Sequence, residues 1–401
     1  MSEQAASDVR VLDLTWYIAG PYCTKLLADY GADVVKVERP DRGDPARNMG
    51  PFLGDDPDRE KSGLFLYLNT NKKGITLNLK TAAGVKLFKE LAREADAVVE
   101  SFSPGTMAEL GLDYETLEKV NPRLVMTSIS NYGQSGPYRD YKATELIEQA
   151  SAGHLYATGQ PDREPVRTGA YISCYQAGLF AAIGTLSALW CRDDTGLGQH
   201  VDVSIMEVVN NLTTYPPTIK SYTGSLRPDF YLRTGKTSSL GIVPCQDGYV
   251  VANLYSVREW EGFLAILGMP EMMEVFLKDK IFSPNTYTEW ISERVLPWFA
   301  ERTTDEVFHQ AQGVHVAVGP VLTMQQVIEF PQYQAREFLL EIEHPRTGRL
   351  FYPGAPFKMA GSPWQVRSPA PLLGEHNKEI YCDHLGYSSQ DLVKLRDRGT
   401  I

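Results

Sequence analysis

The residues with the most evident chemistry are positively charged side chains gathered in three stretches of an acidic chain. They are Lys36, Arg39, Arg42, Arg47, Lys72, Lys73, Lys80 and Lys142. Fixed cations of this kind could bind an anionic small ligand. The formal net charge of −11 makes nucleic acid a poor partner, because binding a phosphate backbone requires a basic surface. Any one of these cations, taken alone, is more often a solubilising surface charge.

Other chemical groups are few. Five cysteines, at positions 23, 174, 191, 245 and 382, form no C-x-x-C pair, which is typical of free thiols in a reducing cytoplasm. A lone cysteine is more often a small buried hydrophobe than a reactive group. The sequence contains no dinucleotide-binding or phosphate-binding glycine motif, no zinc motif and no hydrolase nucleophile motif, so it predicts neither a bound nucleotide cofactor nor a metal. The polar start and the lack of a long apolar run predict a cytoplasmic protein without membrane insertion.

The elements that must position these groups alternate between strand and helix in the first half of the chain. Strand signals lie at residues 11–14, 34–38, 74–79, 97–100 and 124–129. Helix signals separate them, including one over 81–93 capped by Thr81. Such repetition predicts right-handed crossovers and a doubly wound α/β layer.

The second half changes character. Residues 178–188 are small and apolar, which predicts a buried helix, and a glycine turn then leads into a strand ending near Ser204. A stretch rich in Thr, Tyr, Ser, Pro and Gly follows, as expected for a linker. Beyond it, Asp247-Gly248 predicts a hairpin.

Seven segments of the chain together resemble one enzyme family. In order they are VLDLTWYIAGPYCTKLLADYGADVVKVERP, LNTNKKGITLNLK, ADAVVESFSPGTMAELGL, NPRLVMTSISNYGQSGPY, KATELIEQASAG, TGAYISCYQAGLFAAIGTLSALWCRDDTGLGQHVDVSIMEVV and PLLGEHNKEI. This series is similar to the class III CoA-transferase family, also called the carnitine-CoA-transferase and formyl-CoA-transferase family. The resemblance extends over almost the whole chain.

The resemblance implies an α/β fold with two domains and an interlocked dimer. A Rossmann-like large domain would be formed by both chain ends, residues 1–205 and 336–401. Residues 206–240 would form a linker, and residues 241–335 a smaller α+β domain.

The resemblance also implies the ligand and its contacts. The substrate would be a coenzyme A thioester, with no permanently bound cofactor and no metal. Ile18 and Ala19 would lie beside the CoA, and Arg39 at its adenosine-phosphate end. The nucleotide would be lined by Leu77, Asn78, Lys80, Ser101, Phe102 and Ser103. Lys142 and Glu145 would lie beside the thioester.

Cys174 is where the sequence departs from the family. Register places it at the family's aspartate, which attacks the acyl-CoA carbonyl and then carries CoA as an aspartyl thioester. A thiol could form only an ordinary acyl thioester, because it has no carboxyl carbon on which CoA could be held. The double displacement therefore cannot be copied by Cys174, whereas the family's supporting acid is retained as Glu145.

Four interpretations follow from this substitution. The first, which the sequence favours, is a nucleophile-lacking subunit paired with an aspartate-bearing paralogue, as in the heteromeric arylsuccinate-type enzymes that transfer CoA from succinyl-CoA to benzylsuccinate-like acids. The second is a self-sufficient transferase in which the acceptor carboxylate attacks the thioester directly. The third is α-proton chemistry by Cys174 and Glu145, as in acyl-CoA racemases, although Thr144 stands where those enzymes use histidine. The fourth is a non-enzymatic protein that binds CoA thioesters.

Overall fold

The computed structural model of the protein describes residues 4–159, 163–212, 220–222, 240–254, 256–278 and 290–401. The chain divides into two compact units. The first unit contains residues 1–154, 168–213 and 335–401, so that both ends of the chain contribute to it. The second contains residues 155–167 and 214–334.

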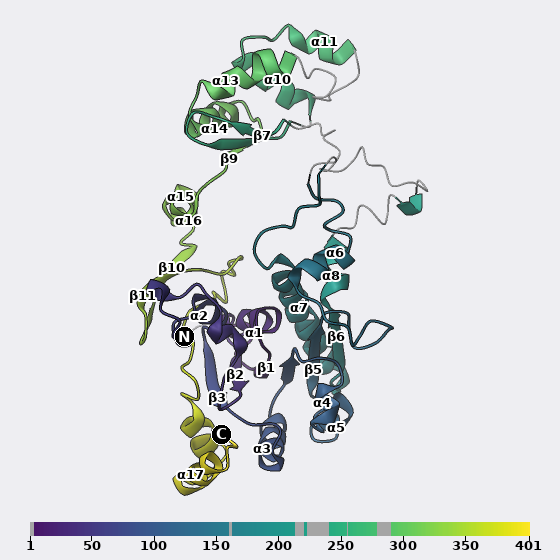
Figure 1. Ribbon diagram of the computed structural model, residues 1–401, viewed down its shortest axis with the longest axis vertical. Helices are drawn as coiled ribbons and strands as arrows, with labels where there is room; N and C mark the ends of the chain where they lie inside the picture. Colours follow the sequence, from purple (N-terminus) through teal and green to yellow (C-terminus); the bar gives the residue numbers. More distant parts are fainter. Residues whose placement is uncertain (1–3, 160–162, 213–219, 223–239, 255, 279–289) are drawn as a thin grey trace. The chain divides into compact units, whose positions relative to one another are not determined.

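A six-stranded sheet forms the centre of the first unit (Figure 1). Its strands are β1 Arg10–Leu14, β2 Asp33–Glu38, β3 Lys72–Thr76, β4 Ala97–Glu100, β5 Val125–Ser130 and β6 His200–Ser204. They lie in the order β3-β2-β1-β4-β5-β6, and each neighbouring pair is parallel. The predicted α/β layer is therefore confirmed, because parallel neighbours require crossover connections over the sheet faces.

The boundaries of β3 differ from the sequence prediction. The apolar pattern predicted a strand over residues 74–79, but the ladder with β2 runs from Lys72 to Thr76. Strand β2 ends at Glu38, so the pairing stops there, with one further bond from the Leu77 amide to the Glu38 carbonyl at 2.7 Å. Leu77 and the residues after it consequently belong to the loop at the carboxyl end of β3.

Helices cover both faces of this sheet, as the alternation of side chains along each strand requires. The helices on one face are α1 (Ala19–Asp29), α7 (Ile172–Thr195) and α8 (Ile205–Leu212). Those on the other are α3 (Ala82–Ala92), α5 (Tyr114–Glu118) and the π-helical turn η7 (Glu379–His384). Val11 faces the first layer and Leu12 the second. Thr81 caps α3 as predicted, accepting a hydrogen bond from the Gly84 amide.

Helix α7 is only half buried, which corrects the prediction of a buried helix over 178–188. Its small residues face α1, where a Cβ on Gly178 would lie 2.4 Å from the Ala19 carbonyl oxygen. The larger apolar residues Leu179, Ile183, Leu186 and Trp190 are exposed in the single chain. In length and composition α7 also passes as a possible membrane span among the described residues, although a core helix of this kind does so too.

The remaining elements of the first unit are short. They are α2 (Gly63–Leu68), α4 (Thr106–Glu109), α6 (Glu145–Ser151), α17 (Ser389–Asp397), η1 (Pro45–Asn48), η2 (Leu53–Asp55), and the antiparallel pair β10 (Leu339–His344) and β11 (Gly348–Pro353). The C-terminal residues contact β3, since Asn377 Oδ1 accepts a hydrogen bond from the Thr76 amide at 2.8 Å.

The second unit contains a three-stranded antiparallel sheet and short helices. The strands are β7 (Gly241–Pro244), β8 (Tyr249–Ala252) and β9 (Val318–Pro320). The helices are α10 (Val257–Ile266), α11 (Met272–Lys278), η6 (Ile291–Val295), α13 (Leu296–Ala300), α14 (Thr304–Gly313) and α15 (Met324–Glu329), and α16 (Pro331–Ala335) lies at the boundary. The hairpin predicted at Asp247-Gly248 is confirmed, with Cys245 donating to the Gly248 carbonyl.

The expected linker, residues 206–240, begins inside a helix. Residues 206–212 belong to α8 and to the first unit. Of the remainder, 213–219 and 223–239 lie outside the described residues.

Candidate active site

The predicted ligand-binding residues of the first unit lie at one edge of its sheet. Each loop in question directly follows a parallel strand, with Trp16 after β1, Arg39 after β2, Leu77 after β3 and Ser101 after β4. The strand order reverses between β1 and β4. Open α/β sheets bind ligands outside the carboxyl ends of the strands at such a point. The Trp16 amide donates to Ser101 Oγ at 2.9 Å and joins the two loops there.

Arg39, Trp16 and Phe102 form a contact group at this point. The Arg39 guanidinium lies over the Trp16 ring, 4.7 Å from its centroid, and that ring meets Phe102 edge-on at 5.1 Å. Arg39 Nε is buried and has no hydrogen-bond partner among the described residues. A planar cation with spare donors beside aromatic rings suits a phosphate and an adenine. The sequence pointed to Arg39 and Phe102 but not to Trp16, although Trp16 follows a strand and a polar turn.

The other predicted CoA contacts, at the nucleotide and at the thioester, differ in what their side chains can do. Lys142 and Ser103 are exposed and joined by a hydrogen bond from Lys142 Nζ to Ser103 Oγ at 3.2 Å. Lys80 is also exposed. Leu77, by contrast, is buried in the core, and Asn78 Nδ2 donates to the Gly399 carbonyl at 3.1 Å. The structure therefore assigns Leu77 and Asn78 local structural contacts.

Ile18 and Ala19 lie at the beginning of α1. Both are buried, and the Ile18 carbonyl accepts a hydrogen bond from the Tyr22 amide at 2.8 Å. Gly178 of α7 approaches the backbone of Ala19 closely. These two residues are thus held between the β1 loop and α7, and this contact places the start of α7 next to the β1 loop.

Three of the cations considered as anion binders are instead buried structural charges. Lys36, Arg47 and Lys72 are almost completely inaccessible. Lys36 pairs with Asp44 at 2.9 Å, Lys72 with Asp13 at 3.0 Å, and Arg47 with Glu38 at 2.7 Å. Each cation has a carboxylate in direct contact, as buried charges require. The interpretation of these three as ligand-binding cations is therefore wrong.

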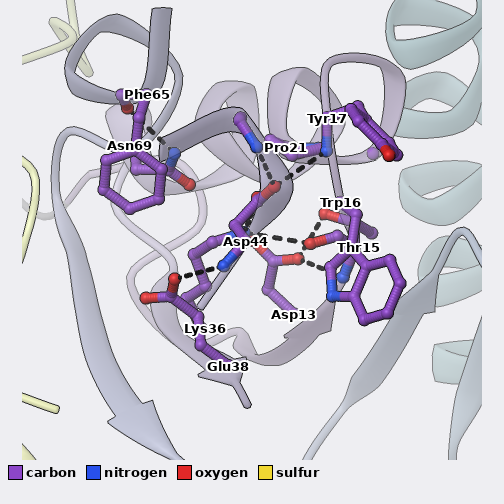
Figure 2. Close-up of polar contacts among 12 residues, drawn as sticks. Asp13, Thr15, Trp16, Tyr17, Pro21, Lys36, Glu38, Asp44, Phe65 and Asn69 are labelled. Carbon is purple, nitrogen blue, oxygen red and sulfur yellow. Dashed lines mark hydrogen bonds and ion pairs between the residues drawn. The ribbon is translucent and has the colours of Figure 1, made fainter. Parts of the chain in front are cut away.

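This buried network shapes the loop after β1, as Figure 2 shows. Asp13 accepts hydrogen bonds from the amide and hydroxyl of Thr15, and Lys36 Nζ donates to the Thr15 carbonyl at 3.0 Å. Asp44 accepts from the amide of Tyr17 at 3.0 Å. Tyr17 has φ of 65°, a left-handed conformation that a tyrosine adopts only when its surroundings impose it.

The ionisation of the network follows from its composition. Burial alone would raise the pKa of Asp13, but Lys36 and Lys72 overcome it and lower the pKa to about 2. Burial lowers the pKa of Lys72 to about 8, with Asp13 opposing the shift. At neutral pH the network is thus a set of opposite charges, each stabilised by its neighbours.

Glu145 lies at the first position of α6 and binds the start of α7. Its Oε1 accepts hydrogen bonds from the Ser173 amide at 2.9 Å and from Gln149 Nε2 at 2.7 Å, and its Oε2 accepts from the Cys174 amide at 3.3 Å. The first amides of a helix lack partners within the helix, and no side chain of the preceding residue Tyr171 caps α7. Glu145 supplies that cap, so the predicted pair of Glu145 and Cys174 is brought together.

Cys174 is partly buried in the first turn of α7. Burial, followed by the neighbouring carboxyl groups of Glu148 and Glu145, raises the pKa of its thiol well above the usual range. The thiol is therefore protonated at neutral pH, and only a thiolate is an effective nucleophile. The helix N-terminus that would lower such a pKa is already occupied by Glu145.

Glu148 is a site residue that the sequence did not predict. It lies one turn after Glu145 on α6 and is 2% exposed. Ligand atoms of Glu145, Glu148 and Cys174 lie within 4.8 Å of one another, which also makes them a group that could hold a metal ion. Burial and then Glu145 raise the pKa of Glu148 to about 7. The i, i+3 spacing of two acids on a short helix was the signal available in the sequence.

A second buried acid, Glu100 at the end of β4, was also missed. Its carboxylate accepts a hydrogen bond from the Phe102 amide at 2.7 Å and thereby orients the loop that carries Phe102. Burial raises its pKa to about 7, with Ser128 opposing the shift. Ser128 also contacts His200 at 2.8 Å.

Comparison with known proteins agrees with this geometry. The sequence profile of CoA-transferase family III matches residues 7–377. Formyl-CoA:oxalate CoA-transferase of Streptomyces avermitilis is 34% identical, over 99% of this chain and 100% of that protein. Succinyl-CoA–D-citramalate CoA-transferase of Chloroflexus aurantiacus is 34% identical, over 98% and 97%. A crystal structure of a CAIB/BAIF family protein from Brucella suis matches with a TM-score of 0.80 at 26% identity, over 95% of this chain and 99% of that one. The chain belongs to CoA-transferase family III.

Proposed function

We propose that this chain binds an acyl-CoA thioester at the carboxyl edge of its sheet and forms a transferase centre in which Cys174 is not the nucleophile. As a family III CoA-transferase it moves CoA between an acyl-CoA and a carboxylic acid. The observation that carries the proposal is the raised pKa of the Cys174 thiol, enclosed with two carboxyl groups. Such a thiol neither ionises readily nor offers a carboxyl carbon for CoA.

The CoA would lie with its phosphates at Arg39 and its thioester near Glu145. Supporting this orientation, Arg39 has a buried Nε without a partner in the described part of the chain, and Lys142 provides a further exposed cation nearer to α6. The thioester end would reach the first turn of α7. We place the protein in the cytoplasm, with CoA thioester as substrate rather than a resident cofactor.

One arrangement is a heteromer with an aspartate-bearing paralogue. Here the partner would supply the covalent carboxylate, and succinyl-CoA would be the donor. The exposed apolar face of α7, formed by Leu179, Ile183, Leu186 and Trp190, supports an additional subunit, because an apolar stripe of this kind favours burial. We propose an interlocked dimer in which the residues after α8, 213–240, link the domains.

The native mass tests this arrangement. The protein purified from its own cells would be analysed by native mass spectrometry, with peptide identification of any companion. A complex containing a second family member with aspartate at the position of Cys174 is the expected result. A homodimer without a companion would rule out the heteromer and leave the CoA-binding proposal intact.

A second arrangement is a transferase that is complete without a paralogue. Glu148 favours it, because this chain keeps a buried carboxyl group beside the position of the missing aspartate. The α-proton alternative has less support, since Thr144 precedes Glu145 and offers no ionisable group as a second base. A non-enzymatic binding protein would have no need of this buried acid.

A further inference from the structure

We propose that Glu148 is the covalent nucleophile of this chain, the carboxylate that accepts the acyl group and then CoA in place of residue 174. The proposal deepens the second arrangement above and rests on the proposed CoA-transferase function. It identifies a catalytic residue on a different helix from the family's aspartate position.

The position of Glu148 allows this replacement. Helix α6 lies beside the start of α7 (Figure 1), and the Glu145 hydrogen bonds to Ser173 and Cys174 fix the two helices to each other. Because reactive atoms of Glu148 and Cys174 lie within 4.8 Å, a thioester carbonyl presented to residue 174 is also close to Glu148. Glutamate is one methylene longer than aspartate, which helps it to reach the same carbonyl from the neighbouring helix.

The state of the Glu148 side chain points to a ligand. Its Oε2 is buried and has no hydrogen-bond partner among the residues that the structure describes, and no cation there pairs with it. Leaving a buried polar oxygen unpaired costs roughly 1–3 kcal/mol. Structural carboxylates elsewhere in this unit avoid that cost, as Asp13 and Glu38 do with Lys72 and Arg47. A nucleophilic oxygen, in contrast, must keep a free lone pair.

The cysteine at position 174 also favours a carboxylate at Glu148. With aspartate at position 174, three carboxyl groups would meet within about the same few ångströms, and like charges at that distance cannot all ionise in a buried site. A neutral thiol removes this repulsion. The sequence thus retains two carboxyl groups at the centre, with Glu145 as the cap of α7 and Glu148 as the free acid.

The chemistry balances without another reactant. The Glu148 carboxylate attacks the acyl-CoA carbonyl, and the C–S bond breaks to give an acyl-glutamyl anhydride and CoA thiolate. The thiolate attacks the glutamyl carbonyl and releases the donor acid as its carboxylate. The acceptor carboxylate then attacks the glutamyl-CoA thioester and expels the thiolate, which finally attacks the acceptor's acyl carbon and regenerates the Glu148 carboxylate.

The ionisation of Glu148 suits this task. A pKa of about 7, raised by burial and by Glu145, leaves an appreciable carboxylate fraction at neutral pH. A carboxylate poised near the working pH is more basic than an ordinary glutamate, and nucleophilicity rises with basicity. Cys174, whose pKa is raised further from the working range, remains neutral beside it.

Trapping the covalent intermediate tests the assignment. The full-length recombinant chain would be incubated with succinyl-CoA or formyl-CoA, quenched with hydroxylamine, digested and analysed by mass spectrometry. Hydroxylamine converts a glutamyl anhydride or glutamyl thioester into a stable hydroxamate. The expected result is a hydroxamate on Glu148, its loss in Glu148→Gln, and its persistence in the remote control Cys191→Ser. Cys174→Ser separates the thiol from the acid, because the hydroxamate remains if Glu148 carries the group.

CoA binding, measured in parallel by calorimetry, distinguishes failure of the nucleophile assignment from failure of the proposed CoA-transferase function. A protein that binds CoA but gains no hydroxamate at Glu148 from either donor overturns the nucleophile assignment and leaves the binding function intact. The same conclusion follows if the hydroxamate forms on Glu145. Absence of CoA binding would instead refute the proposed function itself. If Glu148→Gln fails to fold, Glu148→Asp retains the carboxylate and should give a weaker hydroxamate signal at the same residue.

Discussion

Two groups of buried charges in the same unit differ in how their charges are balanced. Around the β1 loop, Asp13 and Asp44 each contact a lysine, and neighbouring oxygens accept hydrogen bonds from backbone amides. At the junction of α6 and α7, Glu145, Glu148 and Cys174 meet without a cation in the described residues. The first group is a balanced network, whereas the second is an excess of acid.

The difference separates a structural role from a chemical one. Paired charges offset the cost of their own burial and hold a strained loop in place. A buried acid without a cation beside it has a raised pKa, as Glu148 does, and keeps a lone pair available. The β1 network therefore forms the support of the site, and the α6–α7 cluster is where a reaction would take place.

The largest expected effect comes from breaking the balanced network. Asp13→Asn leaves Lys72 and Lys36 buried with one counter-charge fewer, which should lower the free energy of unfolding by roughly 3–5 kcal/mol. Urea denaturation followed by circular dichroism measures this change. Asp41→Asn is the control, because its pair with Arg42 is exposed and should contribute less than about 1 kcal/mol. Similar losses of stability in both variants would contradict the supporting role of the buried network.

The acidic cluster should make the folded state less stable as pH rises, whereas Asp13 of the balanced network should make it more stable. The pKa of Glu148 is about 7 in the folded chain and 4.5 without its environment, so between these values the folded state holds the extra proton. The contribution of the protonated Glu148 side chain to the free energy of unfolding is therefore full below pH 4.5 and is lost as pH rises through 7. This loss amounts to roughly 3 kcal/mol at about 1.36 kcal/mol per pKa unit.

Thermal unfolding of wild type and Glu148→Gln at several pH values tests this dependence. The variant should be less sensitive to pH between 4.5 and 7, with the remaining slope arising from Glu100. Asp13 contributes in the reverse sense, because its pKa is lowered to about 2 and its stabilisation is lost as pH falls from 3.8 through 2. An unchanged slope in Glu148→Gln would show that Glu148 is not a buried acid in solution.

A cation with a free donor should matter for ligand affinity rather than for stability. Arg39→Ala should weaken CoA binding by roughly tenfold to a hundredfold, since a hydrogen bond to a charged group contributes about 1.5–3 kcal/mol. Isothermal titration calorimetry with CoA measures the effect. Arg42→Ala, which removes an exposed arginine three residues away, should leave the affinity almost unchanged. Equal effects would place the phosphates elsewhere.

Adding a third carboxyl group to the α6–α7 cluster should increase the repulsion between its acids. Cys174→Asp should destabilise the protein by roughly 1–2 kcal/mol, and adding Glu148→Gln should recover much of that loss through their coupling. Denaturation of the two single variants and the double variant gives the coupling energy. The double variant should also gain slow thioester exchange through the new aspartate. Strict additivity would mean that the two positions do not interact.

The smallest expected effect concerns thiol reactivity. Cys174 should react with iodoacetamide more slowly than Cys191 by at least about tenfold, because Cys174 is partly buried and its pKa is raised, whereas Cys191 is exposed. Peptide mass spectrometry of a time course measures both rates in one sample. Faster alkylation of Cys174 would reveal an activated thiol and restore it as a candidate nucleophile.

Sequence patterns predicted the parallel sheet well because short apolar runs separated by helical periodicity leave few alternatives. They missed the end of β3, since only its pairing with β2 decides where the strand stops at Thr76. The pattern of charges alone also grouped Lys36 and Lys72 with Arg39 as candidate anion-binding residues, although Lys36 and Lys72 lie inside the fold. Charge type is visible in a sequence, but exposure and partners depend on which strands become neighbours.

The sequence by itself determined the family, the α/β layer and the presence of cysteine at the family's nucleophile position. These properties depend on the order and identity of residues, which local patterns record directly. Only the tertiary structure decided that Glu145 caps α7, that the Cys174 thiol is protonated and that Glu148 lies beside it. The reason is physical, because a pKa depends on desolvation and on charges brought close through space, and residues 148 and 174 become neighbours only when α6 packs against α7.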